Sequence, residues 1–114
     1  MRKLYIVKRK QDFDDIINQG IFKKNNSFII YYRKNNLVYD RYGISVGKKL
    51  GNAVFRNSYK RKIRAIIDNY KKDYVNGTDY IIILRRGSLK NDFSSLNRDL
   101  VNLMINIRKD SNNE

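Results

Sequence analysis

The 114-residue chain contains no cysteine, histidine, proline or tryptophan. Without cysteine it has no disulfide, no thiolate metal site and no cysteine nucleophile. Without histidine it lacks the side chain most often used as a general base or metal ligand. Hydrolytic chemistry by the protein alone would therefore have to use carboxylates, and the alternative is that a partner supplies the catalyst.

Acidic residues are scarce as well. The chain has 25 Lys and Arg against 11 Asp and Glu, which gives a formal net charge of +14. Such a charge attracts polyanions, so nucleic acid is the expected class of partner. An anionic membrane surface is the competing partner, but the apolar runs at 28–32 and 80–84 are far shorter than the ~20 residues that span a bilayer. We therefore expect no membrane partner.

The chain lacks the marks of several domains. Its basic first ten residues have no apolar stretch of the kind found in a signal peptide, so the cytoplasm is the expected compartment. We find no linker and no internal repeat, which predicts a single domain over 1–114 with a frayed tail at 110–114. Nine tyrosines, five phenylalanines and a hydrophobic fraction of 41% favour one folded core.

Three segments have the composition of β-strands. Residues 27–33 are rich in aromatic and β-branched side chains, and the Asn-Asn pair at 35–36 can turn the chain into a second strand at 38–46. These two segments predict a β-hairpin. The third segment, 79–84, is an unbroken apolar run that follows an Asn-Gly pair at 76–77, which indicates a central strand.

Apolar residues recur at helical spacing in three further segments. The first, 11–19, is followed by a glycine that suits its C-terminal cap. The second, 53–74, has an apolar face and a neighbouring cationic face, and the third, 93–108, has an apolar stripe with Asn91 or Asp92 as its cap. The residues expected to pack are Phe55, Tyr59, Ile63, Ile66, Ile67 and Tyr70 in the second helix and Phe93, Leu96, Leu100, Leu103, Met104 and Ile107 in the third.

The connection from the second strand into the second helix contains several features suited to anions. Lys48 and Lys49 enter the connection, and Gly51 and Asn52 allow the backbone to turn. The start of the helix that follows can point free N–H groups and its dipole at phosphate oxygens. The connection therefore predicts contacts with a phosphate backbone.

The second helix continues this pattern. Arg56, Lys60 and Arg64 recur at every fourth residue, and Arg61 lies alongside them. A solvated helix face would also explain such charges. However, residues 56–64 hold five cations and no carboxylate, so no pair within the segment relieves their repulsion, and a bound anion would. The helix thus predicts a surface that binds folded RNA by its phosphates.

The same segment resembles the signature of the bacterial ribonuclease P protein family. The resemblance includes an Arg-Asn-x-x-Lys-Arg core at 56–61, and features at 12–13, 20 and 28–31 extend it over most of 2–109. The matching residues of the signature are Lys48, Lys49, Leu50, Gly51, Asn52, Ala53, Val54, Arg56, Asn57, Lys60, Arg61 and Arg64.

The resemblance implies a fold and a function. The implied fold is an α+β class α/β sandwich with about four mainly antiparallel strands, three flanking helices, a left-handed β-α-β crossover around the basic helix, and a short extra strand near 21–23. The implied function is that of an accessory subunit that helps a catalytic RNA remove the 5′ leader from precursor tRNA. The resemblance places the active site in the RNA, with Mg²⁺ held mainly by the RNA and the holoenzyme. The implied partners are the catalytic ribonuclease P RNA and precursor tRNA, and no obligatory protein partner is expected.

The resemblance also implies two RNA surfaces. The residues carried over to the surface for the catalytic RNA are Lys48, Lys49, Asn52, Arg56, Asn57, Lys60, Arg61 and Arg64. Phe13 and Tyr31 are carried over to a central cleft for the single-stranded leader, although core packing is an alternative role for both. Ile17 belongs to the same cleft but stands where family members often have a second aromatic residue. Gly47 and Ser58 also depart from the family pattern.

The composition is also compatible with other functions. A nuclease made of protein alone would need carboxylates around a metal ion, and Asp12, Asp14 and Asp15 are the only dense set. Their place at the start of a helix explains them more simply. A noncatalytic ribosomal or RNA-assembly protein would have a similar composition, and only the motif disfavours it. DNA binding is disfavoured because the chain has no helix-turn-helix, zinc-finger or basic-zipper pattern.

Overall fold

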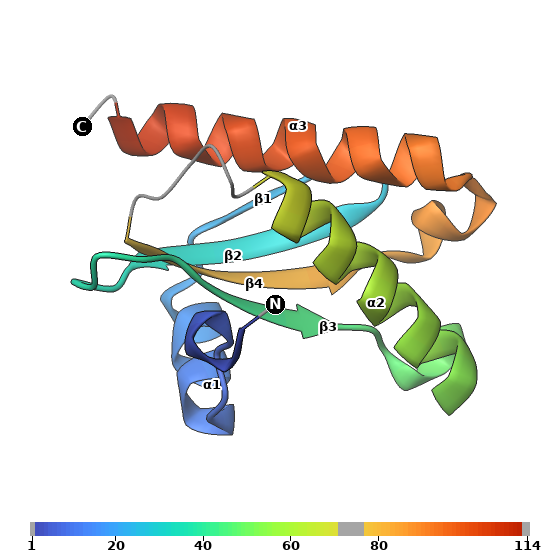
Figure 1. The fold of residues 1–114 in the computed structure, drawn as a ribbon, viewed down its shortest axis with the longest axis horizontal. Coiled ribbons are helices and arrows are strands. Elements are labelled where there is room, and N and C mark those ends of the chain that lie inside the picture. The colour runs from blue at the N-terminus through green and yellow to red at the C-terminus, as the bar shows by residue number, and fades with distance from the viewer. Residues whose placement is uncertain (1, 71–76, 113–114) are drawn as a thin grey trace.

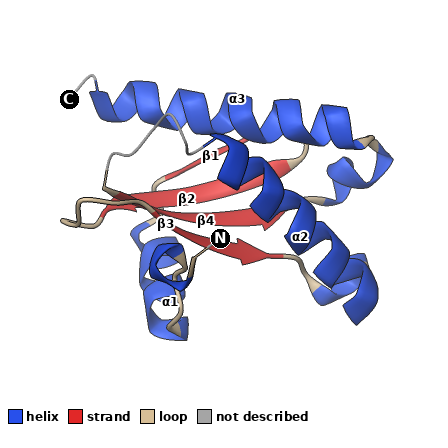
Figure 2. Cartoon of the chain, in the orientation of Figure 1, coloured by secondary structure: helices blue, strands red, loops and turns tan. Residues whose placement is uncertain are grey.

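The computed structural model describes residues 2–70 and 77–112. Within these ranges one four-stranded sheet has helices on both of its faces (Figures 1 and 2). Short 3-10 turns lie at Lys3–Tyr5, Lys48–Leu50 and Arg86–Lys90. The main elements are α1 (Lys10–Gln19), β1 (Phe22–Lys24), β2 (Phe28–Lys34), β3 (Arg41–Ser45), α2 (Ala53–Tyr70), β4 (Thr78–Leu84) and α3 (Phe93–Asn112).

The strands lie in the order β1-β2-β4-β3. The pairs β1–β2 and β2–β4 are antiparallel, whereas β3 and β4 are parallel. The predicted hairpin is therefore wrong, because β4 lies between the two segments that were expected to pair. β4 pairs with all seven residues of β2, and this long apolar pairing outweighs the local turn signal at 35–36. Val38, expected in a strand, is 90% exposed in the connecting loop.

The central position expected for 79–84 is confirmed, and so is the crossover. The chain leaves β3, passes through α2 and returns as the parallel neighbour β4. In Figure 1 α2 lies in front of the sheet, both arrows point to the right and β4 lies above β3, which is the left-handed sense. The extra strand implied near 21–23 is present as β1, one residue later.

The main core lies between the sheet and the pair α2 and α3. Successive side chains of a strand point to opposite faces, so alternate residues of β2 and β4 face these two helices. The rings of Tyr42 and Tyr80 stack across the parallel pair with centroids 5.3 Å apart. The buried residues that build this core include Phe28, Ile30, Ile82, Leu84, Ile63, Ile66, Ile67, Leu96, Leu100, Leu103, Met104 and Ile107. The apolar faces expected for the two helices are thus confirmed except near their starts, because Phe55 packs on Gly51 and Tyr59 instead and Phe93 is 52% exposed.

The helix ends differ slightly from the expected ones. Gly20 caps α1 with a φ of 75°, as its residue type predicts. The described part of α2 ends at Tyr70, and the expected continuation over 71–74 lies outside the described residues. α3 is capped by Asp92, whose Oδ1 accepts a hydrogen bond from the Ser95 N–H at 2.8 Å. It runs to Asn112, so the first residues of the expected tail are helical, and Asp110 forms an ion pair with Lys23 of β1.

Candidate nucleic-acid interface

The start of α2 is fixed by Asn52 and Gly51. The Oδ1 atom of Asn52 accepts a hydrogen bond from the Phe55 N–H at 2.9 Å, so this side chain is the helix cap. Gly51 has an extended backbone, and a Cβ atom there would lie 2.4 Å from the ring of Phe55. A glycine at position 51 therefore lets the Phe55 ring pack against the backbone at the bend that leads into α2. This bend places Lys48 and Lys49, both exposed, directly before the first turn of the helix.

The sequence-predicted RNA residues gather along this connection and one side of α2, which we call the α2 face. Asn52, Asn57, Arg61 and Arg64 are exposed there together with the two lysines of the connection, while Arg56 and Lys60 are half-buried. Among the described residues no carboxylate forms an ion pair with a cation of this face. Asn52 has a structural role that the motif alone did not reveal.

The three residues expected to form the leader cleft meet on the opposite face of the sheet, which we call the α1 side. Phe13 and Ile17 of α1 and Tyr31 of β2 are all half-buried and pack against a small cluster of Val7, Ile16 and Ile81. Their partial exposure leaves apolar surface open to a ligand. Sequence reasoning missed Phe22, which is 44% exposed with its ring centroid 5.3 Å from that of Tyr31.

Gly43 explains how Phe13 reaches the sheet. A Cβ atom at Gly43 would lie 2.5 Å from Cζ of Phe13 and 2.8 Å from Cδ1 of Ile81. The Phe13 ring therefore packs directly against the backbone of β3. The side chain of any larger residue at position 43 would occupy the space that the ring fills. Sequence reasoning missed this contact because Gly43 and Phe13 are 30 positions apart and lie on different elements.

The two surfaces adjoin at the outer edge of β3. Arg64 of α2 and Phe13 of α1 line the same cavity of about 140 Å³, together with Gly43 and Ile44 of β3 and Ile6 of the N-terminal segment. Arg64 was predicted for the catalytic RNA and Phe13 for the leader. The structure brings these two residues to one place, which the sequence did not indicate.

A group of charged side chains lies at one end of the α1 side. Asp79 is fully buried, and its carboxylate accepts hydrogen bonds from Arg41 at 2.8 and 2.7 Å and from Asn35 at 2.9 Å. Arg33 donates a longer one at 3.4 Å. Burial by itself raises the pKa of Asp79, but the hydrogen bonds from Arg41 and Asn35 outweigh it, and the pKa lies below its ordinary value.

Asp12 is held in a similar way at the start of α1. Its two oxygens accept hydrogen bonds from Nε and Nη2 of Arg9 at 3.1 and 3.0 Å, and these bonds are the main reason that its pKa is lowered. Asp14 forms an ion pair with Lys10 at 3.2 Å. Two of the three aspartates considered for catalysis are thus engaged with basic side chains.

Comparison with known proteins decides the family. The family model described as Ribonuclease P matches residues 1–108. The chain belongs to the ribonuclease P protein family. The ribonuclease P protein component of Mesoplasma florum is 42% identical over 110 residues, which cover 96% of this chain and all of that protein. The component from Streptococcus equi subsp. equi is 43% identical over 100 residues, which cover 88% of this chain and 83% of that one.

Solved ribonuclease P proteins have the same fold. One from Staphylococcus aureus has a TM-score of 0.81 and 34% identity, covering 88% of this chain and 92% of its own. Another, from Thermotoga maritima, has a TM-score of 0.77 and 34% identity, covering 82% and 89%. The expected α/β sandwich is thereby confirmed.

Membership in the ribonuclease P family defines the general role of the chain. It is an RNA-binding component of a ribonucleoprotein that processes tRNA, and its partner is the ribonuclease P RNA. The alternative of a ribosomal or assembly protein is not favoured. Within the two described ranges no helix is long and apolar enough to cross a membrane.

Proposed function

We propose that the chain binds the catalytic RNA through the α2 face and the single-stranded 5′ leader of precursor tRNA through the α1 side, while the RNA carries the active site. The observation that carries this proposal is the cavity shared by Arg64 and Phe13. It connects a cationic surface with an aromatic one, so an RNA on the first and a leader on the second would touch at the edge of β3.

The α2 face suits a folded RNA. Arg61 and Arg64 are exposed and have no carboxylate partner among the described residues, so their full hydrogen-bonding capacity is free for phosphates. Lys48 and Lys49 add charge at the start of the helix, where the helix dipole also favours anions. Such contacts fix the position of an RNA without reading its sequence.

The α1 side suits a single strand. Phe13, Tyr31 and Phe22 present aromatic surface on which bases can stack, and base–aromatic stacking tolerates any sequence. Ile17 adds apolar contact but no π-face, so this chain has fewer stacking positions than a cleft with an aromatic residue there. A leader of variable sequence requires this kind of tolerance.

The described residues offer Mg²⁺ no group of three or more metal-ligating side chains. Asp12, Asp14 and Asp15 do not converge on one point that could hold an ion, and Asp12 and Asp14 are paired with Arg9 and Lys10. Mg²⁺ keeps much of its water and is usually bound by one or two carboxylates together with phosphate oxygens, which RNA supplies in abundance. We propose that Mg²⁺ is held mainly by the RNA and the holoenzyme, and we derive no catalytic step from this chain.

Reconstitution tests the proposed function. The protein is added to a bacterial ribonuclease P RNA at low Mg²⁺ with a precursor tRNA, beside RNA-only and protein-only controls. We expect 5′ leader removal in the mixture and little in either control, because the protein strengthens the binding of substrate and metal ions.

Two other outcomes would contradict the proposal. Cleavage by the protein alone would require an active site made of carboxylates in this chain. Tight binding of the RNA without any stimulation of cleavage would separate RNA binding from a role in processing.

A further inference from the structure

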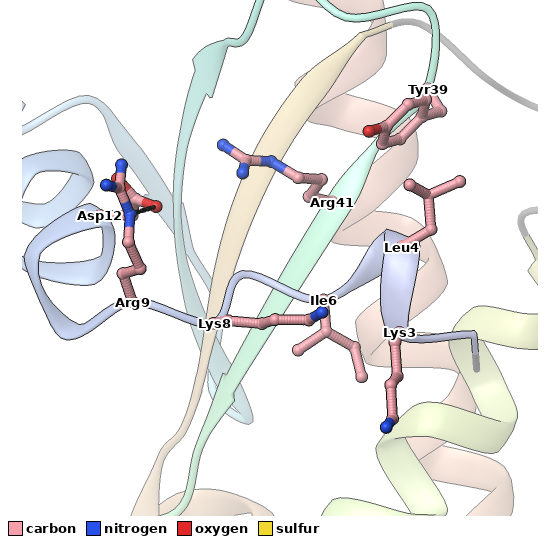
Figure 3. Close-up of a pocket in the computed structure, with 8 residues that line it drawn as sticks. All are labelled: Lys3, Leu4, Ile6, Lys8, Arg9, Asp12, Tyr39 and Arg41. Carbon is pink, nitrogen blue, oxygen red and sulfur yellow. Dashed lines mark hydrogen bonds and ion pairs between the residues drawn. The ribbon is translucent and has the colours of Figure 1, made fainter.

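A second and larger cavity lies at the other end of β3. The N-terminal segment runs along the outer edge of this strand, where Ile6 bridges to Tyr42 and the Val7 N–H donates a hydrogen bond to the Tyr42 carbonyl at 3.0 Å. A cavity of about 340 Å³ opens between this segment and the starts of β3 and α1 (Figure 3). Its volume falls within the range of small-ligand pockets.

Two arginines of the cavity are held in place by carboxylates. Arg41 binds Asp79 through Nε and Nη2, and Arg9 binds Asp12 through the same two atoms. In both arginines Nη1 makes no further hydrogen bond to the described residues. Figure 3 shows Arg41 extending from β3 towards the start of α1, where Arg9 and Asp12 lie. Each carboxylate thus fixes an arginine and leaves one nitrogen free to donate to a ligand.

The other residues that line this cavity are either charged or largely apolar. Lys3 and Lys8 are exposed and have no ion pair with a described carboxylate. With the two arginines they make four cations, against Asp12 in the lining and Asp79 behind it, which leaves a surplus of two positive charges. The other lining residues are Leu4, which is 49% exposed, Ile6 and Tyr39.

This cavity continues the aromatic surface of the α1 side. Arg9 lies one helical turn before Phe13, whose N–H donates to the Arg9 carbonyl at 3.2 Å. Arg41 and Gly43 are two residues apart on β3 and face the same side of the sheet, and Gly43 lies against the ring of Phe13. The cavity and the aromatic surface therefore meet along both α1 and β3.

We propose that this cavity binds one nucleotide of single-stranded RNA, as an extension of the leader cleft. Its phosphate would lie within reach of Lys8, Arg9 and Arg41, and its base would lie against Tyr39 and Leu4. A cationic wall facing an apolar and aromatic one is the arrangement that single-strand binding proteins use for nucleotides. The proposal rests on the proposed function, because it assumes that the leader occupies the α1 side.

The test measures the affinity of the reconstituted holoenzyme for precursor tRNAs whose leaders range from about two to about twelve nucleotides. The variant carries Lys3→Gln and Lys8→Gln, two exposed residues outside the core. The matched control carries Lys90→Gln and Lys109→Gln, which remove the same charge from exposed positions on other elements. We expect the cavity variant to lose about threefold to tenfold in affinity for the long leaders only, with the control unchanged.

A second variant tests the arginine without removing its charge. Arg41→Lys keeps a cation beside Asp79 but removes the free Nη1, and it should also weaken binding of the long leaders while short ones are unaffected. Its unfolding in urea is measured in parallel. If stability were unchanged and affinity for short and long leaders fell equally or not at all, Arg41 would make no contact with the leader and the proposal would be overturned.

The remaining outcomes separate the cavity from the rest of the molecule. The wild type and the variant with Lys3→Gln and Lys8→Gln could both bind long leaders more tightly than short ones, and by the same factor. In that case the cavity proposal fails, and the proposal that the α1 side binds the leader is supported. If the variant weakens assembly with the catalytic RNA alone, the cavity holds phosphates of that RNA and the assignment to the leader is wrong. A wild type indifferent to leader length would overturn both the cleft and its extension.

Discussion

Asp79 is the most deeply buried charged residue in the described part of the chain. It lies in the first half of the central strand, and its two oxygens hold Arg41 and Asn35 from two other parts of the chain. A carboxylate in such a place stabilises the fold only while it remains ionised and fully hydrogen-bonded. The sequence shows an aspartate at the edge of an apolar run, but the partners come from β3 and from the β2–β3 loop. No local pattern connects them.

Replacing this carboxylate should destabilise the protein strongly. We expect Asp79→Asn to lower the free energy of unfolding by about 3 kcal/mol, because it leaves Arg41 without a counter-charge. Urea unfolding measures the change. The control is Asp14→Asn at an exposed ion pair, which should change stability by less than about 0.5 kcal/mol. Equal losses for the two variants would show that the buried contacts of Asp79 contribute nothing special.

Stability should also fall in acid. The pKa values of Asp79 and Asp12 in the folded protein lie below the ordinary value of 3.8. Their contribution is therefore complete above the unfolded pKa and is lost as the pH falls through the lower folded values. Urea midpoints between pH 7 and pH 3 should decline below about pH 4 to 5, and less steeply in Asp79→Asn. Parallel curves for wild type and variant would contradict this assignment.

Gly43 should not tolerate a side chain. In Gly43→Ala the added methyl group would meet the ring of Phe13 at 2.5 Å, so the ring must move, and we expect a loss of about 1–3 kcal/mol. Leader-dependent affinity should fall as well. Gly47→Ala is the matched control, because nothing lies within 4 Å of its added atom. If both variants unfolded at the same urea concentration, the close packing of Phe13 on β3 would be refuted.

At the scale of elements, the sequence predicted what depends on local spacing. α2 and α3 follow from apolar residues at helical intervals, and the central place of β4 follows from a run that is apolar on both faces. The pairing of β3 was missed, because a turn signal at 35–36 says only that the chain turns and not which strand lies beside it. The α2 face followed from one continuous motif at 48–64, whereas the contacts of the α1 side combine α1, β2 and β3.

The charge of the α2 face should matter for RNA and little for folding. We expect Arg61→Ala to weaken binding of the catalytic RNA about threefold to tenfold, because an exposed guanidinium is removed from a phosphate. Filter binding at moderate salt measures the loss, and urea unfolding should change by less than about 0.5 kcal/mol. Lys109→Ala on α3 removes the same charge elsewhere. Equal RNA affinity of wild type and Arg61→Ala would contradict the role of this face.

At the scale of the whole molecule, the net charge is +14, and some of the cations form ion pairs whereas others do not. Carboxylates hold Arg9, Arg41 and Lys23 in ion pairs, while the cations of the α2 face have no such partner among the described residues. Within the described ranges the α2 face thus gathers a continuous group of unpaired cations, and the aromatic surface lies on the opposite face of the sheet. Binding through the charged side should depend strongly on salt.

The salt dependence of RNA binding measures how many phosphates the α2 face contacts. If the α2 face contacts about five phosphates, log Kd for the catalytic RNA should change with log salt with a slope of roughly 3.5 to 4.5 in magnitude. Titrations at several potassium chloride concentrations measure the slope. Loss of one contact in Arg61→Ala should reduce it by somewhat less than about one unit. A nearly flat dependence for the wild type would exclude an electrostatic interface.

The order of the strands has a consequence for biosynthesis. β4 is the last strand to leave the ribosome, although it lies between β2 and β3 in the finished sheet. Until it emerges, the nascent chain lacks the partner that both earlier strands require, and Ile81 is not yet present beneath Phe13. The basic segment that becomes α2 is therefore exposed early, but neither RNA surface takes its final form before most of the polypeptide has been synthesised.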